Sequence, residues 1–253
     1  SSAMTNGGLL KTGAGTLELT GVSTYGSGTT VNAGMLKVNN ASGSATGTGA
    51  LAINNGATLG GAGFIGGVTT INNGGILAPG NSAGTITINN DLILNSGSIL
   101  NYELDTPGVV GAGVNDLTIV NGALTLDGVM NITDLGGFGD GTYRLFNYTG
   151  ALTDNGLLFG TAPAPYDFTL DTATAGEINL TVAAATTQYW DGPHTSPNGA
   201  VNGGTATWDA VATNWTNAAG NANFAWVDSL NAVFAGDAGT VTVASGFAPT
   251  VSS

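Results

Sequence analysis

Carboxylates are the most numerous ionisable side chains in this sequence, 16 in all. Glu103 and Asp105 stand two positions apart in an alternating segment, which would place both on one face of a strand, and Asp116 could lie on a neighbouring coil of the chain. Two carboxyl groups about 5–10 Å apart can hydrolyse a glycosidic bond. A solvated acidic face beside Pro107-Gly108 explains the same residues more simply. We therefore name Glu103 and Asp105 as a candidate carboxylate pair and favour the structural interpretation.

Aromatic side chains form the second candidate site. No tryptophan occurs before residue 190, and then four occur within 37 positions: Trp190, Trp208, Trp215 and Trp226. Flat apolar ring faces can stack on sugars, so these residues are candidate glycan contacts. A small aromatic core is the interpretation that we favour, because this part of the chain has few other large apolar residues.

Two glycine-rich motifs match catalytic or cofactor signatures by letter only. Residues 80–84 read Gly-x-Ser-x-Gly, the signature of a serine nucleophile at a strand-to-helix turn, and residues 61–66 match the dinucleotide fingerprint. Both motifs precede strand-like segments rather than helices, and His194 is the only histidine that could serve as a base. We therefore predict turns at both places, with no catalytic and no cofactor-binding residues.

A third motif bears on metal binding. Residues 136–141, Gly-Gly-Phe-Gly-Asp-Gly, are similar to one copy of a calcium-binding nonapeptide. That repeat binds calcium through several stacked copies, whereas here it occurs once, with its aspartate one place early. We predict a turn and no metal ligands. Calcium held between aspartates of neighbouring coils is the alternative, because the formal net charge is −13.

Composition excludes several classes of protein. Lys and Arg total 3 against 16 Asp and Glu, too few cations to bind nucleic acid or an anionic membrane surface. Hydrophobic residues make up 42% of the chain, which argues against disorder, yet no apolar run approaches the ~20 residues of a membrane-inserted helix. The 43 glycines disfavour long helices, and the absence of cysteine excludes disulfides. An all-β fold remains.

The elements that must position these residues are short alternating runs ended by Asn-Gly-rich turns. An isoleucine precedes asparagine at Ile53, Ile71 and Ile88, in steps of 18 and 17, and Val31 is an earlier counterpart. A fixed step predicts a repeat architecture, in which strands too short to stand alone stack as coils of a solenoid. Hairpins in a β-sandwich are the alternative, since Asn-Gly is also a hairpin signal. The regular step favours the solenoid.

Composition also divides the chain into three segments. Residues 1–135 are predicted to form the β-helix coils. Residues 136–187 are richer in aromatic residues and prolines, and we predict a cap-like β-strand region of the same domain, which would shield the open core. Residues 188–253 hold the tryptophans, and we predict a separate Trp-rich β segment that is the start of a following repeat unit.

Several motifs together resemble a known family. Residues 7–19 and 24–36, with Gly-Thr-Leu-Glu-Leu in the first and Val-Asn-Ala-Gly-Met-Leu in the second, resemble the autotransporter-associated β-strand repeat of bacterial autotransporter passenger domains. Residues 77–85 are similar to a later turn of that family. Tyr189–Gly192, together with Thr213–Trp215, resembles the opening of a following passenger unit.

This resemblance implies a right-handed parallel β-helix that is extracellular or displayed on the bacterial outer cell surface. It implies a structural or adhesive role as a rigid stalk, adhesin or filament, without catalytic residues. The expected partners are other copies of the chain, associating end to end or laterally, and host, surface or matrix glycans and proteins. Two alternatives remain: a polysaccharide-active β-helix enzyme, and a glycan-binding module that uses the Trp-rich segment.

Overall fold

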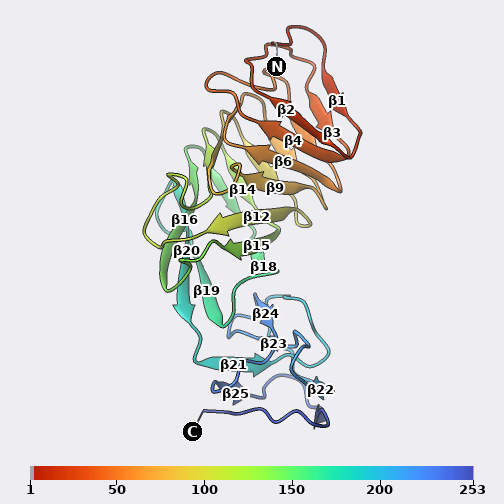
Figure 1. The fold of residues 1–253 in the computed structure, drawn as a ribbon, viewed down its shortest axis with the longest axis vertical. Coiled ribbons are helices and arrows are strands. Elements are labelled where there is room, and N and C mark those ends of the chain that lie inside the picture. Colours follow the sequence, from red (N-terminus) through yellow and green to blue (C-terminus); the bar gives the residue numbers. More distant parts are fainter. Residues whose placement is uncertain (1–2, 253) are drawn as a thin grey trace.

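The molecule is long and narrow, with its two termini at opposite ends (Figure 1). The computed structural model describes residues 3–252, so the outermost residues of the first and last predicted segments lie outside the described part. These 250 residues form strands, turns and loops and contain no helix, so they include no helix that could span a membrane. The chain is all-β, as its composition predicts.

Three stacks of parallel strands build the upper part of the molecule. Sheet 1 contains, in spatial order, β1 (Leu9–Lys11), β3 (Thr29–Val31), β5 (Leu51–Ile53), β8 (Thr69–Ile71), β11 (Leu92–Leu94), β14 (Leu124–Leu126) and β17 (Leu152–Asp154). Sheet 2 contains β2 (Thr16–Leu19), β4 (Gly34–Val38), β6 (Ala57–Gly61), β9 (Ile76–Pro79), β12 (Ile99–Leu104), β15 (Val129–Asp134) and β18 (Leu158–Phe159). The parallel part of sheet 3 contains β7 (Phe64–Ile65), β10 (Thr85–Ile88), β13 (Leu117–Val120) and β16 (Gly141–Tyr148). The chain visits the sheets in turn, so the predicted parallel β-helix is confirmed.

The interior is filled by aligned columns of apolar side chains. Val31, Ile53, Ile71 and Leu94 stand in register on consecutive strands of sheet 1 and are almost completely buried. Ile88, which the sequence step of 17 placed in this column, lies instead on β10 of sheet 3, in register with Ile65. The constant step fails because coils differ in length: Thr69 pairs with Leu92, but Leu92 pairs with Leu124.

A ladder of asparagine side chains follows one corner of the β-helix. Asn54 Nδ2 donates to Asn32 Oδ1 at 2.7 Å, Asn72 Nδ2 to Asn54 Oδ1 at 2.7 Å, and Asn95 Nδ2 to Asn72 Oδ1 at 3.1 Å. Each asparagine follows a sheet 1 strand, so one bond per coil ties neighbouring corners together. An amide suits this position because it carries both a donor and an acceptor.

The region predicted to be cap-like, residues 136–187, contains both parallel and antiparallel strand pairs. Residues 136–159 still belong to the coils, because β16 pairs in parallel with β13, and β17 and β18 extend sheets 1 and 2. The aromatic residues that suggested a cap there, Tyr143 and Phe146 among them, point into the β-helix and are fully buried. The cap is the antiparallel hairpin of β19 (Tyr166–Asp171) and β20 (Glu177–Ala184), which is hydrogen-bonded to β16.

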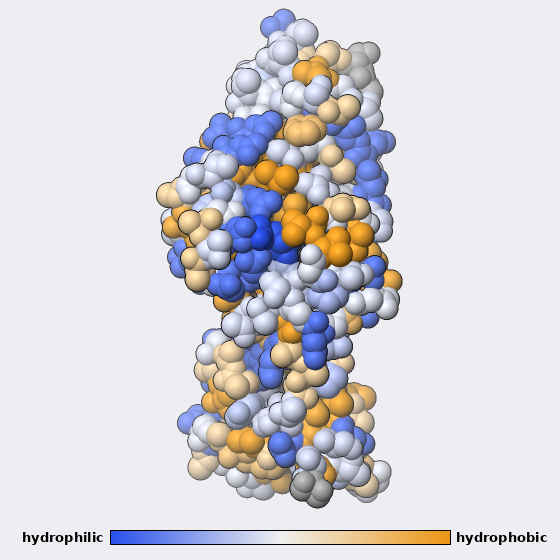
Figure 2. Space-filling view, turned by 90° about the vertical axis from the view of Figure 1, so that its left-hand side faces the viewer, coloured by the Kyte–Doolittle hydropathy of each residue, from blue (hydrophilic) through white to orange (hydrophobic). Residues whose placement is uncertain are grey.

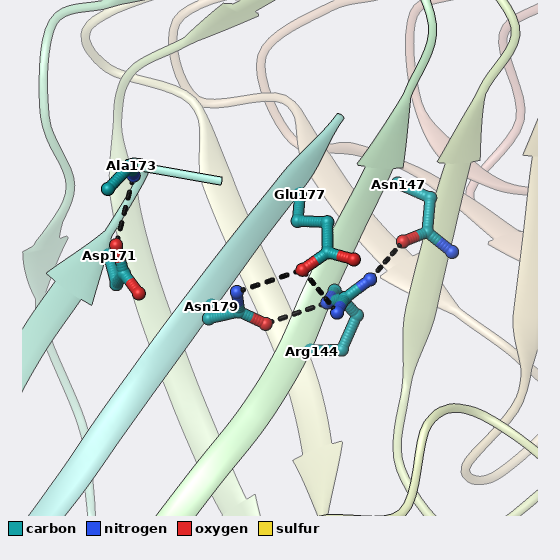
Figure 3. Close-up of polar contacts among 6 residues, drawn as sticks. All are labelled: Arg144, Asn147, Asp171, Ala173, Glu177 and Asn179. Atoms are coloured by element: carbon teal, nitrogen blue, oxygen red, sulfur yellow. Dashed lines mark hydrogen bonds and ion pairs between the residues drawn. The ribbon is translucent and has the colours of Figure 1, made fainter. Parts of the chain in front are cut away.

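A polar cluster on the surface fastens this hairpin to the coils. The guanidinium of Arg144 on β16 forms an ion pair with Glu177 and donates to Asn179 Oδ1, at 2.7 Å, and to Asn147 Oδ1, at 2.7 Å (Figure 3). Hydrophilic residues gather across the middle of the face that carries β16 and β20 (Figure 2). Arg144 is the only arginine in the chain, and it sits where parallel pairing changes to antiparallel pairing.

The Trp-rich segment forms a second stack of strands below the first, in which some pairs are parallel and others antiparallel. Its strands are β21 (Thr187–Trp190), β22 (Ala206–Trp208), β23 (Trp215–Thr216), β24 (Asn223–Phe224), β25 (Asn231–Val233) and β26 (Val241–Val243). β21 pairs in parallel with β25, and β22 with β26, while Leu230 forms a parallel bridge with Val251. Successive coils therefore stack again after the hairpin. That this is the first part of a following repeat unit stays a prediction.

An aromatic contact joins the two stacks. The ring of Phe168 in the cap stacks on Phe159 with centroids 4.8 Å apart, and lies 6.2 Å from Phe224 of the Trp-rich segment. The backbone N–H of Phe159 donates to the carbonyl of Asn221 at 2.7 Å. The lower end of the β-helix core is thus covered by the hairpin and by β24.

Candidate functional site

A hollow of about 620 Å³ lies on the outer face of sheet 2. Its lining includes Lys37 on β4, Ala78 on β9, Glu103 on β12 and Thr133 on β15. Gly60 pairs with Lys37 on one side and Ala78 on the other, so two of these three neighbouring positions carry small residues. Ala78 and Gly80 contribute little side-chain volume to the lining, and the polar residues around them give the hollow hydrogen-bonding groups.

Asp116 forms one side of this hollow. Its Oδ1 accepts the N–H of Gly84 and its Oδ2 accepts the N–H of Glu103, both at 2.8 Å, and the residue is only 1% exposed. Burial raises the pKa of Asp116 to about 7, against the opposing effect of the two backbone donors, and the carboxylate of Glu103 adds to the rise. Asp116 is therefore poised to exchange a proton near neutral pH.

Glu103 contributes the second carboxyl group of the hollow. It projects from the outer face of β12, and its Oε2 is buried without a hydrogen-bond partner among the described residues. Asp105, the predicted partner of Glu103, follows the end of β12 and is absent from the lining of the hollow. Its backbone N–H is bound by Asn115 Oδ1 at 2.6 Å. The structure brings Glu103 to Asp116 rather than to Asp105.

The Gly-x-Ser-x-Gly motif borders the same hollow as a turn. Gly80 has a φ of +85°, and a Cβ there would lie 1.9 Å from the carbonyl oxygen of Ser82, so only glycine fits. The turn leads into strand β10, as predicted, and not into a helix. His194 lies in the Trp-rich segment and is absent from this lining, so Ser82 has no histidine base beside it.

The four tryptophans lie in a core, the interpretation that the sequence analysis favoured over glycan contacts. Trp190, Trp208, Trp215 and Trp226 are 1%, 7%, 0% and 7% exposed. Their rings pack on one another at centroid distances of 4.6–5.2 Å, with Phe234 and Phe247 around them. Rings buried in this way have no face to offer a sugar, because neighbouring side chains cover them.

The remaining motifs give no binding site. Residues 61–66 lie at the corner between β6 and β7, where no helix N-terminus is present to receive a phosphate. Asp140 in residues 136–141 is exposed in the loop before β16. Over residues 3–252 there is no group of three or more His, Cys, Asp or Glu residues arranged to hold a metal ion. The predictions of no cofactor, and of calcium as the alternative, stay predictions.

A second hollow, of about 450 Å³, lies where the β-helix meets the Trp-rich segment. Thr195, Ser196 and Asn223 line one side of it. Asn131 and Thr161 line the other side, and the same two residues also line the first hollow. The two hollows are therefore adjacent along sheet 2. Sequence reasoning gave no signal for this second hollow, because its walls come from two separate parts of the chain, residues 131–164 and 195–225.

Two comparisons with known proteins bear on identity. The family model of the passenger-associated-transport-repeat matches residues 9–38, which form β1 to β4. The chain is also 43% identical over 158 residues to the adhesin BmaC autotransporter of Brucella suis biovar 1 (strain 1330). That match covers 60% of this chain and 5% of the adhesin. Together the matches confirm the resemblance of this chain to autotransporter passengers, and with it a surface-exposed or secreted location.

Proposed function

We propose that this chain is a rigid, adhesive segment of a surface-displayed or secreted autotransporter passenger, without enzymatic activity. The observation that carries the proposal is the uninterrupted stacking of parallel coils along the β-helix, with a relative that is named an adhesin. Backbone ladders along three sheets make such a stack stiff. A stiff stack can hold binding surfaces at a distance from the cell.

Adhesion is testable by display of the chain on a non-adherent bacterium. Cells that carry the chain on a heterologous outer-membrane anchor should adhere to host-cell or matrix-coated surfaces more than cells with the anchor alone. Equal adherence of both strains, with the chain detected on the surface by antibody, would contradict the adhesive role.

Self-association is the second part of the proposed function. At the upper end, the N–H of Leu9 and the carbonyl of Lys11 bond to the neighbouring coil, so the backbone groups of Leu10 point to the open side of β1. The Leu10 side chain is 64% exposed. At the lower end, Val243 on β26 and Val251 are 46% and 54% exposed. We propose that these edges join end to end between copies.

Sedimentation velocity tests this association with one residue. Leu10→Pro removes the outward N–H and leaves the bonds of Leu9 and Lys11 intact, since proline is tolerated on an edge strand. Leu10→Thr is the matched control, because it reduces apolar surface but keeps the N–H. The wild-type chain and, more weakly, Leu10→Thr should associate with rising concentration, and Leu10→Pro should stay monomeric. A monomeric wild-type chain at all concentrations would contradict end-to-end joining.

Glycoside hydrolysis is the second candidate function, and one observation favours it. Glu103 and Asp116 share a hollow, and the raised pKa of Asp116 is the property of a general acid. Release of reducing ends from a polysaccharide by the wild-type chain, lost in Asp116→Asn, would establish this activity. We expect no release, because both carboxylate oxygens of Asp116 already hold backbone N–H groups.

A further inference from the structure

The two hollows adjoin each other and together have the form of one groove. They share Asn131 and Thr161, and the lining extends from Lys37 on β4 to Ser196 in the Trp-rich segment. We propose that this groove binds a linear, uncharged polysaccharide chain. The inference rests on the proposed adhesive function and names the chemical class of its partner.

The lining is rich in groups that recognise sugar hydroxyls. Amide and hydroxyl side chains recur along the groove, at Asn81, Ser82, Asn101, Asn131, Thr161 and Ser196. Several are already fixed: Asn131 Nδ2 donates to Asn101 Oδ1 at 2.8 Å, and Asn131 Oδ1 accepts the N–H of Thr161 at 2.8 Å. Side chains held in this way lose little conformational entropy when a ligand binds.

Each hollow also contains a buried acceptor without a partner among the described residues. In the first it is Glu103 Oε2, and in the second it is Oδ1 of Asn223, a residue only 7% exposed. The amide of Asn223 is oriented by its own Nδ2, which donates to Asp191 Oδ2 at 2.9 Å. An unpaired buried acceptor is costly, so a ligand that brings donors gains from both positions. Sugar hydroxyls are such donors.

Other polymers fit the groove less well. The groove crosses the strands of sheet 2, whose backbone groups are used in the ladders between coils, so a peptide could not add as a further strand. A net charge of −13 and the two carboxyl groups of the first hollow disfavour acidic polysaccharides and nucleic acids. A long, open shape suits a linear chain better than a compact ligand.

Affinity electrophoresis tests the proposal on the whole chain. Native gels would contain dextran, a soluble β-1,3-glucan or mannan as neutral probes, and hyaluronan as a charged one. Ala78→Gln places a longer side chain on the groove floor, and Glu103→Gln removes the charged acceptor. Ala52→Gln, on the outer face of β5 in sheet 1, is the matched control. Far-ultraviolet circular dichroism and tryptophan fluorescence would confirm that each variant is folded.

We expect at least one neutral probe to retard the wild-type chain and Ala52→Gln equally, with about tenfold weaker binding by Ala78→Gln and Glu103→Gln. The groove assignment would be overturned if no neutral probe retards the wild-type chain, or if hyaluronan alone does. It would also be overturned if Ala78→Gln and Ala52→Gln are retarded equally. If cells that display the chain adhere but the chain binds no polysaccharide, the groove assignment is wrong and the adhesive function stands. If the chain binds polysaccharide in the groove but the cells do not adhere, the adhesive function is wrong and the groove assignment stands.

Discussion

Asp116 shows how one residue links the site to the stability of the fold. Its carboxylate holds the turn at Gly84 and the end of β12 through two backbone bonds, while its surroundings penalise the charge. A single side chain thus fixes the wall of the hollow and carries a proton that is exchanged near pH 7.

The stability of the chain should therefore depend on Asp116 between about pH 4 and pH 7. The folded-state pKa of about 7 exceeds the ordinary 3.8, so the folded state binds the extra proton, and stability falls as pH rises through this window. The full pKa shift of Asp116 corresponds to a change of roughly 4 kcal/mol in the free energy of unfolding. Urea unfolding at pH 5 and pH 8 measures the difference. Asp116→Asn cannot titrate and should lose this component, whereas an unchanged pH dependence in the variant would contradict the assignment.

Arg144 is the second residue with a definite expected effect. Arg144→Ala removes an ion pair and two hydrogen bonds at the junction of β16 and β20, all partly exposed to solvent. We expect the free energy of unfolding to fall by about 1 kcal/mol, with less loss at high salt. Lys37→Ala is the control, because Lys37 lies on a different sheet. A loss in Arg144→Ala no larger than in Lys37→Ala would argue against a role for the cluster.

At this scale the sequence predicted residue types better than residue partners. The alternating pattern correctly placed Glu103 on an outward face, but its partner in the hollow is Asp116, brought back by the loop that follows Pro107-Gly108. That return depends on the path of a long loop, which no local pattern encodes. The tryptophans show the reverse case, since the shortage of other large apolar residues did indicate a core.

At the scale of elements, the local sequence pattern predicted where strands occur but did not predict which strands pair. Ile53 and Ile71 are stacked as the repeat step predicts, whereas Ile88 belongs to another sheet. The step of 17 links similar turns on different faces of the β-helix. Insertions such as residues 105–115 lengthen a coil without altering its strands, so sequence distance alone does not give register.

The asparagine ladder is an element whose contribution can be measured. Asn72→Ala breaks two side-chain bonds, to Asn54 and from Asn95, and should lower the free energy of unfolding by about 1–2 kcal/mol. Asn55→Ala is the control, at an exposed turn position one residue after the ladder. Thermal unfolding of both variants checks this, and equal losses in the two would show that the ladder contributes nothing.

At the scale of the whole molecule, the joint between the two stacks decides whether the chain behaves as one body. Phe159, Phe168 and Phe224 bring coils, cap and Trp-rich segment together. All four tryptophans lie beyond this joint, so their fluorescence reports only the lower stack, while circular dichroism reports mainly the upper one.

Phe168→Ala should separate the unfolding of the two stacks. Loss of this buried ring costs about 3–5 kcal/mol, and the lower stack should then unfold at a lower temperature than the coils. Tryptophan fluorescence and far-ultraviolet circular dichroism, recorded in the same thermal scan, measure the two midpoints. Val211→Ala is the control, since Val211 is 80% exposed and is not part of the tryptophan core. Coincident midpoints in Phe168→Ala would show that the joint does not couple the stacks.

The most direct test of the account as a whole is microscopy of the native cell surface, with gold-labelled antibody raised against this chain. A stiff, surface-displayed passenger segment predicts label on thin projections that extend beyond the outer membrane, or on filaments released from it. Label confined to the cell interior would contradict the account.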